Sequence, residues 1–333
     1  MSGRAAPKSR SPAPGAIPLT SVEPIKPALA TLASTVPAGE EWFGEIKFDG
    51  YRMLVDGREG RVAIFSRNGI PWTAKLPELT KDLAWLAGRG AILDGELVAF
   101  RPDGITSFEL LKEALSEKRT GTLVYMAFDL LALDGWDLRP CRQDDRSRLL
   151  QGLLAGHLSD RVRPSEVQDG APAAFHRAAC EHGLEGIILK RRDARYRAGR
   201  TDSWLKVKCG GRQELAVIGY TDPEGSRSGF GALLLGYRQD DAWVYAGRVG
   251  TGFSMKFLTV FRRKLAAIEQ QTPTAPLPKG HTLKGVHWVV PKYVGEIRFT
   301  EWTKDGILRH PSFLGLREDK RAEEVVREVP VAV

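Results

Sequence analysis

The chain has 333 residues, which is long enough for two domains that each bury a core. Hydrophobic residues make up 42% and charged residues 27%, as in ordinary globular proteins. No run of about eighteen apolar residues exists, so the sequence predicts no membrane span. The net charge of +8 is moderate, so its distribution says more about partners than its size does.

The three cysteines and six histidines give no sign of a metal site or a disulfide framework. Cys141, Cys180 and Cys209 form no CxxC pair and are widely scattered. The histidines show no metal-ligand spacing, so we expect no structural zinc. A reducing cytoplasm suits such a chain.

Residues 1–20 read MSGRAAPKSRSPAPGAIPLT, a basic segment without acidic residues. It lacks the apolar core of a secretory signal, and its prolines and glycines disfavour the amphipathic helix of a transit peptide. We therefore expect a flexible Pro- and Ala-rich tail.

Short strands and helices follow one another between residues 21 and 212. Runs rich in β-branched and aromatic residues predict strands at 42–48, 61–66, 91–100, 123–133, 185–191 and 203–208. Apolar residues at helical spacing predict helices at 77–87, 108–118, 145–155 and 171–183. Because several strands are separated only by tight turns such as DG and NG, we expect mixed or antiparallel sheets.

The stretch from Lys190 to Arg212 is strongly basic. It holds nine lysines and arginines, opposed only by Asp193 and Asp202. Charge alone leaves two interpretations open, a solvated basic loop or a surface for polyphosphate or nucleic acid.

Residues 213–333 have a different pattern. Five strand-like runs lie at 214–221, 231–238, 242–250, 285–291 and 294–303, and one helix at 254–270 lies between the third and the fourth. This is the element order of an OB-fold barrel, a fold that commonly holds nucleic acid.

A lysine at the end of the first predicted strand is the strongest candidate for chemistry. Lys47 alternates with apolar residues in EIKFDGYR, and an Asp49-Gly50 pair turns the chain after it. A lysine held near other cations, or partly out of water, loses its proton more easily and becomes a nucleophile.

KFDGYR resembles the nucleotidyl-lysine motif of ATP-dependent DNA ligases and of the related RNA ligases and capping enzymes. Six further segments resemble the family's other motifs in the expected order, SRNG at 66–69, DGE at 94–96, FDL at 128–130, EGIILK at 185–190, WLKVK at 204–208 and RHPSFLGLREDK at 309–320. The resemblance implies an α+β protein, with an ATP-grasp-like nucleotidyltransferase (adenylation) domain at 21–212 and an OB-fold domain at 213–333.

The resemblance also implies a role for individual residues. Lys47 would attack the α-phosphate of ATP and carry AMP covalently, while Mg²⁺ or Mn²⁺ would be held by oxygen ligands. Asp49, Glu96 and Glu185 are the candidate metal ligands, although Glu96 suits the ribose equally well. Asp94, the first residue of the DGE segment, is also typical of a turn. The remaining candidates for ATP are Glu45 and Ile46 at the adenine edge, Phe128 stacked on the base, Arg52 at the ribose, Arg67 at the sugar or phosphate region, Lys206 and Lys208 at the α-phosphate, and Arg309, Arg317 and Lys320 at the pyrophosphate.

Phe128 has a second interpretation, because an aromatic in YMAFDLL is typical of a core.

Lys206 and Lys208 alternate on one strand and so point to one face. Cys209-Gly210-Gly211-Arg212 suits a hinge between the domains, because paired glycines tolerate large backbone changes.

The substrate implied is nicked double-stranded DNA, and the chain is expected to act as a monomer. PALATLA before Lys47 and GYTDPEGSRSGFGALLLGYR at 219–238 resemble the ligase domain of bacterial ligase D, which implies end joining with Ku near the bacterial nucleoid. The alternatives are an RNA ligase or GTP-dependent capping enzyme, or an inactive DNA-binding protein on the same scaffold.

Overall fold

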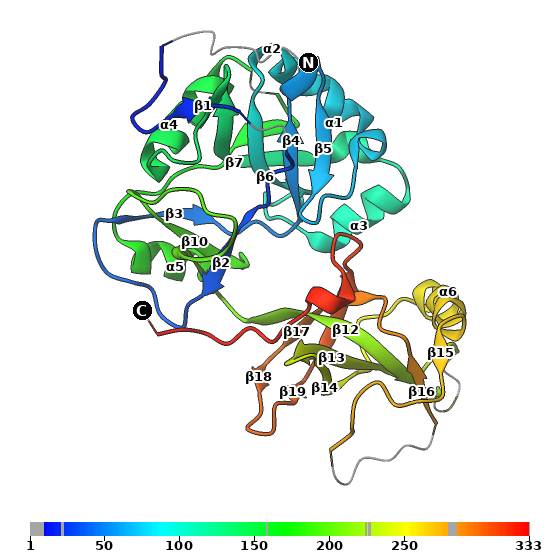
Figure 1. Cartoon of the computed structure of the whole chain (residues 1–333). Coiled ribbons are helices and arrows are strands. Elements are labelled where there is room, and N and C mark those ends of the chain that lie inside the picture. The colour runs from blue at the N-terminus through cyan, green and yellow to red at the C-terminus, as the bar shows by residue number, and fades with distance from the viewer. Residues whose placement is uncertain are drawn as a thin grey trace. The chain divides into compact units, whose positions relative to one another are not determined.

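The computed structural model of the protein describes residues 10–20, 23–157, 159–223, 225, 228–278 and 285–332. The chain divides into two compact units (Figure 1). The first holds Met1–Cys209 and Pro330–Val333, and the second holds Gly210–Val329. Among the described helices, none has the length and apolar character needed to cross a membrane.

The larger sheet of the first unit has the strand order β1-β8-β7-β6-β4-β5, and β9 pairs in parallel with β7. Its helices pack on one face, where Leu79, Leu86, Leu111 and Leu150 join the main core. The strands are β1 (Ile17–Pro18), β4 (Tyr51–Asp56), β5 (Ala63–Ser66), β6 (Ile92–Val98), β7 (Val124–Leu133), β8 (Trp136–Asp137) and β9 (Val162–Pro164). The helices are α1 (Pro77–Asp82), α2 (Leu86–Arg89), α3 (Phe108–Ser116) and α4 (Gln143–Ala155).

The smaller sheet has the order β2-β11-β10-β3, formed by β2 (Ala28–Leu32), β3 (Trp42–Ile46), β10 (Gly186–Arg191) and β11 (Gly199–Lys208). Helix α5 (Pro172–Glu181) covers one face, where Ala179 packs with Leu205 and Val207. Trp204 packs on the other face, against residues of the larger sheet such as Leu54. Because side chains alternate along a strand, Lys206 and Lys208 lie on the same face as Trp204.

The second unit is built on the long strand β12 (Gly211–Thr221), which pairs with three other strands. Its other strands are β13 (Leu233–Gln239), β14 (Ala242–Val249), β15 (Glu269–Gln270), β16 (Val286–Val289), β17 (Val294–Phe299), β18 (Glu301–Trp302), β19 (Leu308–Arg309) and β20 (Ser312–Leu316). Helix α6 (Met255–Ala266) lies between β14 and β16, where the sequence predicted it. The expected α+β fold with a C-terminal OB-type domain is confirmed.

The structure differs from the predicted domain limits at both ends. Residues 10–20 are not a free tail, because Ala13 is buried in the main core and Ile17–Pro18 pairs with β8. Residues 1–9 lie outside the described residues. At the C-terminus, Val331 exchanges backbone hydrogen bonds with Leu32 and Ser34 of the first unit, so 213–333 is not one domain.

Candidate active site

Lys47 lies immediately after β3, and its backbone N–H donates to the carbonyl of Gly186 at 3.0 Å. Its Nζ lies 2.5 Å from Oε1 of Glu185, and both side chains are mostly buried, at 19% and 11% exposed. Gly186 has a φ of 146°, and a Cβ there would meet the backbone of Val207. This backbone, which only glycine adopts easily, places the candidate metal ligand beside the candidate nucleophile.

The register of the smaller sheet places the other candidates in rows across it. Neighbours in a row on paired strands have side chains on the same face. One row holds Glu45, Ile188 and Lys206, and the next towards Lys47 holds Gly186 and Lys208. The predicted cations at the α-phosphate and the predicted adenine-edge residue thus share the face that meets the larger sheet.

Glu45 forms a buried ion pair that the sequence did not predict. Its Oε1 accepts from Nζ of Lys190 at 2.6 Å, and Lys190 also donates to the carbonyl of Phe128 at 2.7 Å. Burial raises the pKa of Glu45 above its usual value of 4.5, and the neighbouring ammonium only partly opposes this. Lys190 is 1% exposed, so the basic stretch from Lys190 to Arg212 is not a single surface.

Arg52 and Asp94 form a second buried ion pair across β4 and β6. The guanidinium donates twice to the carboxylate, at 2.7 and 2.6 Å, and the hydroxyl of Tyr196 donates to it at 2.6 Å. Burial disfavours the charge on Arg52, but Asp94 outweighs it and raises the arginine pKa. Asp94 is fully buried within β6, so its interpretation as a turn residue is wrong.

Gly95 accounts for that error. The ring of Tyr125 occupies the space that a Cβ at this position would need. The DG pair of β6 therefore serves close packing rather than a turn.

Phe128 and Trp204 form an aromatic corner around Arg52 and Lys190. Their rings meet edge to face with centroids 6.0 Å apart. The Arg52 guanidinium lies 4.8 Å, and the Lys190 ammonium 4.8 Å, from the centre of the Phe128 ring. Phe128 is only partly buried where it packs against the core cluster around Trp204, so its ring suits both a core contact and a stacked base.

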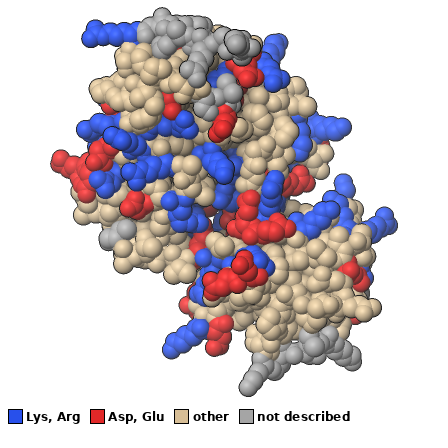
Figure 2. Space-filling view, viewed as in Figure 1, with Lys and Arg blue, Asp and Glu red and all other residues tan. Residues whose placement is uncertain are grey.

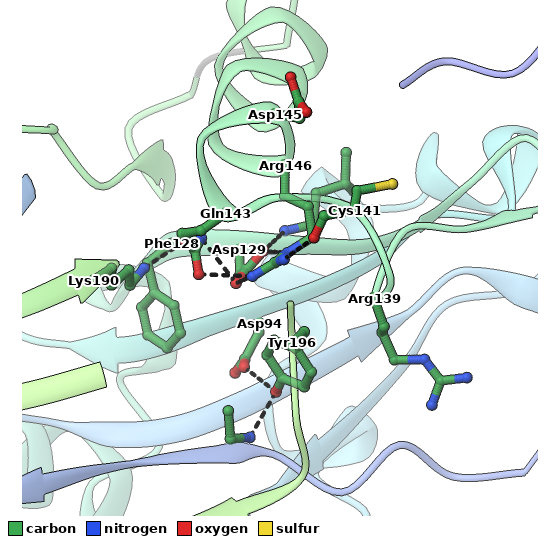
Figure 3. A network of polar contacts seen from close by, with 12 residues as sticks. Asp94, Phe128, Asp129, Arg139, Cys141, Gln143, Asp145, Arg146, Lys190 and Tyr196 are labelled. Carbon is green, nitrogen blue, oxygen red and sulfur yellow. Dashed lines mark hydrogen bonds and ion pairs between the residues drawn. The ribbon is translucent and has the colours of Figure 1, made fainter. Parts of the chain in front are cut away.

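A fully buried polar network fixes this corner from behind (Figure 3). Arg146 of α4 donates to both carboxylate oxygens of Asp129, at 2.8 and 3.0 Å. Gln143 accepts from Arg146 at 2.7 Å and from the indole of Trp204 at 2.8 Å. Because Asp129 follows Phe128 directly, one network holds both rings. Sequence reasoning missed it, because the contacts Arg146–Asp129 and Trp204–Gln143 join residues 17 and 61 positions apart.

The predicted metal ligands are only partly brought together. In the described ranges, Asp49, Glu96 and Glu185 do not form a group of three ligand atoms within 4.8 Å. Glu96 lies opposite Arg52 in the β4–β6 pairing, and the backbone N–H of Asp49 donates to Thr106. A single carboxylate beside the candidate nucleophile suits Mg²⁺, which commonly keeps water ligands and shares phosphate oxygens. Arg67 lies in the turn after β5, and its N–H donates to the carbonyl of Arg52 at 3.1 Å.

Two of the three residues predicted at the pyrophosphate are held by acids of the second unit. Arg317 donates to Asp319 and, at 2.8 Å, to Glu296, while Lys320 donates to Glu214 at 2.7 Å. Asp319 and Glu296 raise the pKa of Arg317 although its burial acts in the opposite direction. The charge of Arg317 therefore balances buried acids of the second unit, and its predicted place at the pyrophosphate stays a prediction. Arg309 is exposed and pairs with Glu301 at 2.6 Å.

The cysteines contradict the expectation from their spacing. Cys180, at the end of α5, is bonded to Cys209, the last residue of the first unit, while Cys141 is a buried free thiol. His176 lies one helical turn before Cys180, with Nε2 3.4 Å from its Sγ.

The predicted hinge at Cys209–Arg212 contains fewer unrestrained residues than expected. Arg212 pairs with Glu296, and the backbone of Phe299 lies against Gly211. Gly210 has no such neighbour within 4 Å.

A lysine at a strand end, a carboxylate beside it and two further lysines on the same face are the groups that nucleotidyl transfer onto lysine would use. Family models support this class across both units. The model described as "ATP dependent DNA ligase domain" matches residues 22–208, and "ATP dependent DNA ligase C terminal region" matches residues 226–320. The chain belongs to the ATP-dependent DNA ligase family.

Relatives within the family carry a more specific name. The chain is 40% identical over 330 residues to "Multifunctional non-homologous end joining protein LigD" of Pseudomonas aeruginosa, covering 98% of this chain and 39% of that protein. It is also 40% identical over 311 residues to a LigD protein of Mycobacterium tuberculosis, covering 91% of this chain and 40% of the relative. The chain thus spans about two fifths of the length of these relatives.

A solved structure agrees with this family. "Mycobacterial DNA ligase D complexed with ATP and MES" matches with a TM-score of 0.65 and 37% identity, over 91% of this chain and 98% of that one. The matched structure therefore has nearly the same extent as this chain.

Proposed function

We propose that this chain seals nicks in double-stranded DNA with ATP, through a lysyl-AMP intermediate on Lys47. The observation that carries the proposal is the Lys47–Glu185 pair, 2.5 Å apart, at the end of a sheet face that also bears Lys206 and Lys208. This geometry supports the proposal, because transfer from a triphosphate needs a nucleophile and positive charge side by side.

The proposed reaction has three steps. The nitrogen of Lys47 attacks the α-phosphorus of ATP, a P–N bond forms, and pyrophosphate leaves. The proton that Lys47 must lose has an acceptor within reach, Oε1 of Glu185. The 5′-phosphate at the nick then attacks the same phosphorus, the P–N bond breaks, and Lys47 leaves as it takes up a proton. Finally the 3′-hydroxyl gives its proton to water and attacks the activated 5′-phosphate, so that the phosphodiester forms, the bond to AMP breaks and AMP leaves.

The remaining residues bind and orient the nucleotide. We assign the adenine edge to Glu45 and the backbone of Ile46, the base-stacking position to Phe128, and the sugar side to Arg67 and Glu96. Lys206 and Lys208 face the α-phosphate. Mg²⁺ or Mn²⁺ at Glu185, aided by Asp49 or Glu96, would supply positive charge to phosphoryl oxygens.

Arg52 has a more restricted role than the resemblance implied. Two of its nitrogens already bind Asp94, so we assign it chiefly to fixing the wall around Phe128.

Figure 2 shows lysine and arginine side chains gathered over the middle of the first unit, a charge pattern that suits a phosphate backbone.

Covalent labelling tests the first step. The full chain is incubated with α-labelled ATP or GTP, alongside Lys47→Ala and the matched control Lys81→Ala, an exposed lysine of α1. We expect ATP to label the wild type and Lys81→Ala, and no label on Lys47→Ala. Label on Lys47→Ala contradicts the nucleophile, and preferential labelling by GTP favours the capping-enzyme alternative.

Sealing of a 5′-phosphorylated nick tests the overall activity. ATP, GTP and NAD⁺ are compared on DNA nicks and on nicks with RNA strands. Sealing of DNA with ATP is the expected result. Binding of nicked DNA without sealing would support the inactive scaffold, and a strict preference for RNA would support the RNA ligase.

We further propose that the chain acts as a monomer in end joining with Ku, at the bacterial nucleoid. The names of the LigD relatives support end joining for those longer proteins. Joining of linear DNA by this chain, with and without Ku, tests the proposal. Stimulation of joining supports it, and an unchanged rate contradicts it.

A further inference from the structure

We propose that His176, Cys180 and Cys209 form a redox-gated binding site for a thiophilic divalent cation of the zinc class. The site uses none of the residues assigned to ATP or to nick sealing. One nitrogen and two sulfur ligand atoms of these half-buried residues lie within 4.8 Å of one another. They are the only such group of three among the residues that the structure describes.

Two structural elements bring the ligands together. His176 and Cys180 are four residues apart on α5, so their side chains lie on one face of the helix. Cys209 follows β11, and its N–H donates to the carbonyl of Glu185 at 3.0 Å. This hydrogen bond anchors the third ligand to the rigid smaller sheet. The separation of 29 residues between the cysteines explains why sequence spacing gave no signal.

The distances suit a tetrahedral cation. With Zn–S bonds of about 2.3 Å and Zn–N bonds of about 2.0 Å, a tetrahedron has an N···S edge of about 3.5 Å and an S···S edge of about 3.8 Å. The Nε2–Sγ distance between His176 and Cys180 is 3.4 Å, already close to that edge. The Cα atoms of Cys180 and Cys209 are 5.2 Å apart, so rotation of the side chains can open the bonded sulfurs to the required separation. Solvent would fill the fourth position.

The oxidised pair excludes the cation, because neither sulfur of a disulfide is a thiolate. A thiol or phosphine reductant supplies two electrons, the S–S bond breaks, and two thiols form with two protons from water. Binding of the cation then displaces both thiol protons and gives a neutral bis-thiolate site with one imidazole. Oxidation reverses the sequence and releases the cation.

Cobalt(II) is the probe that tests this site, because thiolate ligation gives charge-transfer absorption and tetrahedral geometry gives visible d–d bands. The full chain is reduced with a phosphine, freed of metal, and titrated with Co²⁺ and then Zn²⁺. We expect one tightly bound Co²⁺ per chain with thiolate bands, which Zn²⁺ displaces. Oxidation with diamide should remove the bands and reduce the free thiols from three to one.

The variants separate this site from other cation sites on the chain. Cys180→Ser and Cys209→Ser should each lose the thiolate bands, and His176→Ala should weaken Co²⁺ binding at least tenfold. Cys141→Ala is the matched control, because Cys141 is a buried thiol outside the cluster, and it should bind as the wild type does. Labelling by ATP checks that each variant is folded. A reduced wild type without thiolate bands, or full bands in Cys209→Ser, overturns the proposal.

Discussion

The ammonium nitrogen of Lys47 lies 2.5 Å from a carboxylate oxygen of Glu185, although the two residues are 138 positions apart in the chain (185 − 47). The contact exists because Lys47 extends the pairing of β3 with β10 to Gly186. A change of charge at either residue therefore affects both the proposed nucleophile and the carboxylate paired with it.

Lys47→Arg should separate chemistry from structure. The guanidinium keeps a positive charge beside Glu185, so we expect the thermal midpoint of unfolding to stay close to that of the wild type. Arginine is not deprotonated in proteins, so lysyl-AMP formation should fall by at least about a thousandfold. Labelling with ATP and thermal unfolding measure the two effects. Retained labelling would show that another residue is the nucleophile.

Asp94→Asn should destabilise the first unit strongly. The substitution leaves the buried Arg52 without a counter-charge, which costs about 3–5 kcal/mol in such settings. Denaturant unfolding measures the loss. Asp103→Asn is the matched control, because Asp103 pairs with Arg101 at the surface, and we expect no measurable change there. Equal stabilities of the two variants would contradict the structural role of Asp94.

The carboxyl of Glu45 should give the stability of the first unit a distinct pH dependence. Its pKa in the folded chain lies above the usual value of 4.5, so the folded state holds this proton more tightly than the unfolded state does. The resulting stabilisation is fully present below about pH 4.5 and is lost as the pH rises through the raised pKa. Urea unfolding at several pH values should show that slope in the wild type and a flatter one in Glu45→Gln. Identical slopes would contradict the raised pKa.

Arg317 and Arg309 should differ although both lie in the last motif. Arg317→Met leaves Glu296 and Asp319 without their shared cation, so we expect the second unit to lose about 3–5 kcal/mol of stability. Arg309→Ala removes an exposed charge and should leave stability unchanged while slowing lysyl-AMP formation, if this residue meets the pyrophosphate. Denaturant unfolding and labelling with ATP together distinguish an arginine that stabilises the fold from one that takes part in lysyl-AMP formation.

The sequence predicted the strands and helices well where local pattern decides them. The strand just before Lys47, the alternation of Lys206 and Lys208, and helix α6 between β14 and β16 follow from side-chain periodicity. Contacts between distant segments could not be predicted in this way. From the sequence, Lys190 is one of nine basic residues in a charged stretch. The pairing of β10 with β3 buries it against Glu45, and no local pattern predicts that contact.

Two other predictions were wrong because the same local sequence pattern can arise for more than one physical reason. The DG pair of Asp94 and Gly95 is typical of a turn, but here the glycine makes room for the ring of Tyr125. The Pro-rich N-terminal segment is typical of a linker, but Ala13 enters the core and Ile17 reaches β8. Residues 224, 226 and 227 of the ligase D-like run lie outside the described residues.

The return of the C-terminal residues to β2 has a kinematic consequence. The polypeptide passes between the two units twice, at Cys209–Gly210 and again at Val329–Pro330. A body attached at one point can pivot in every direction, whereas a body attached at two points turns about the line that joins them. While Val331 stays paired with Leu32 and Ser34, both ends of the second unit are tethered to the first unit, and release of that pairing would leave Cys209–Gly210 as the single covalent connection that is held in place.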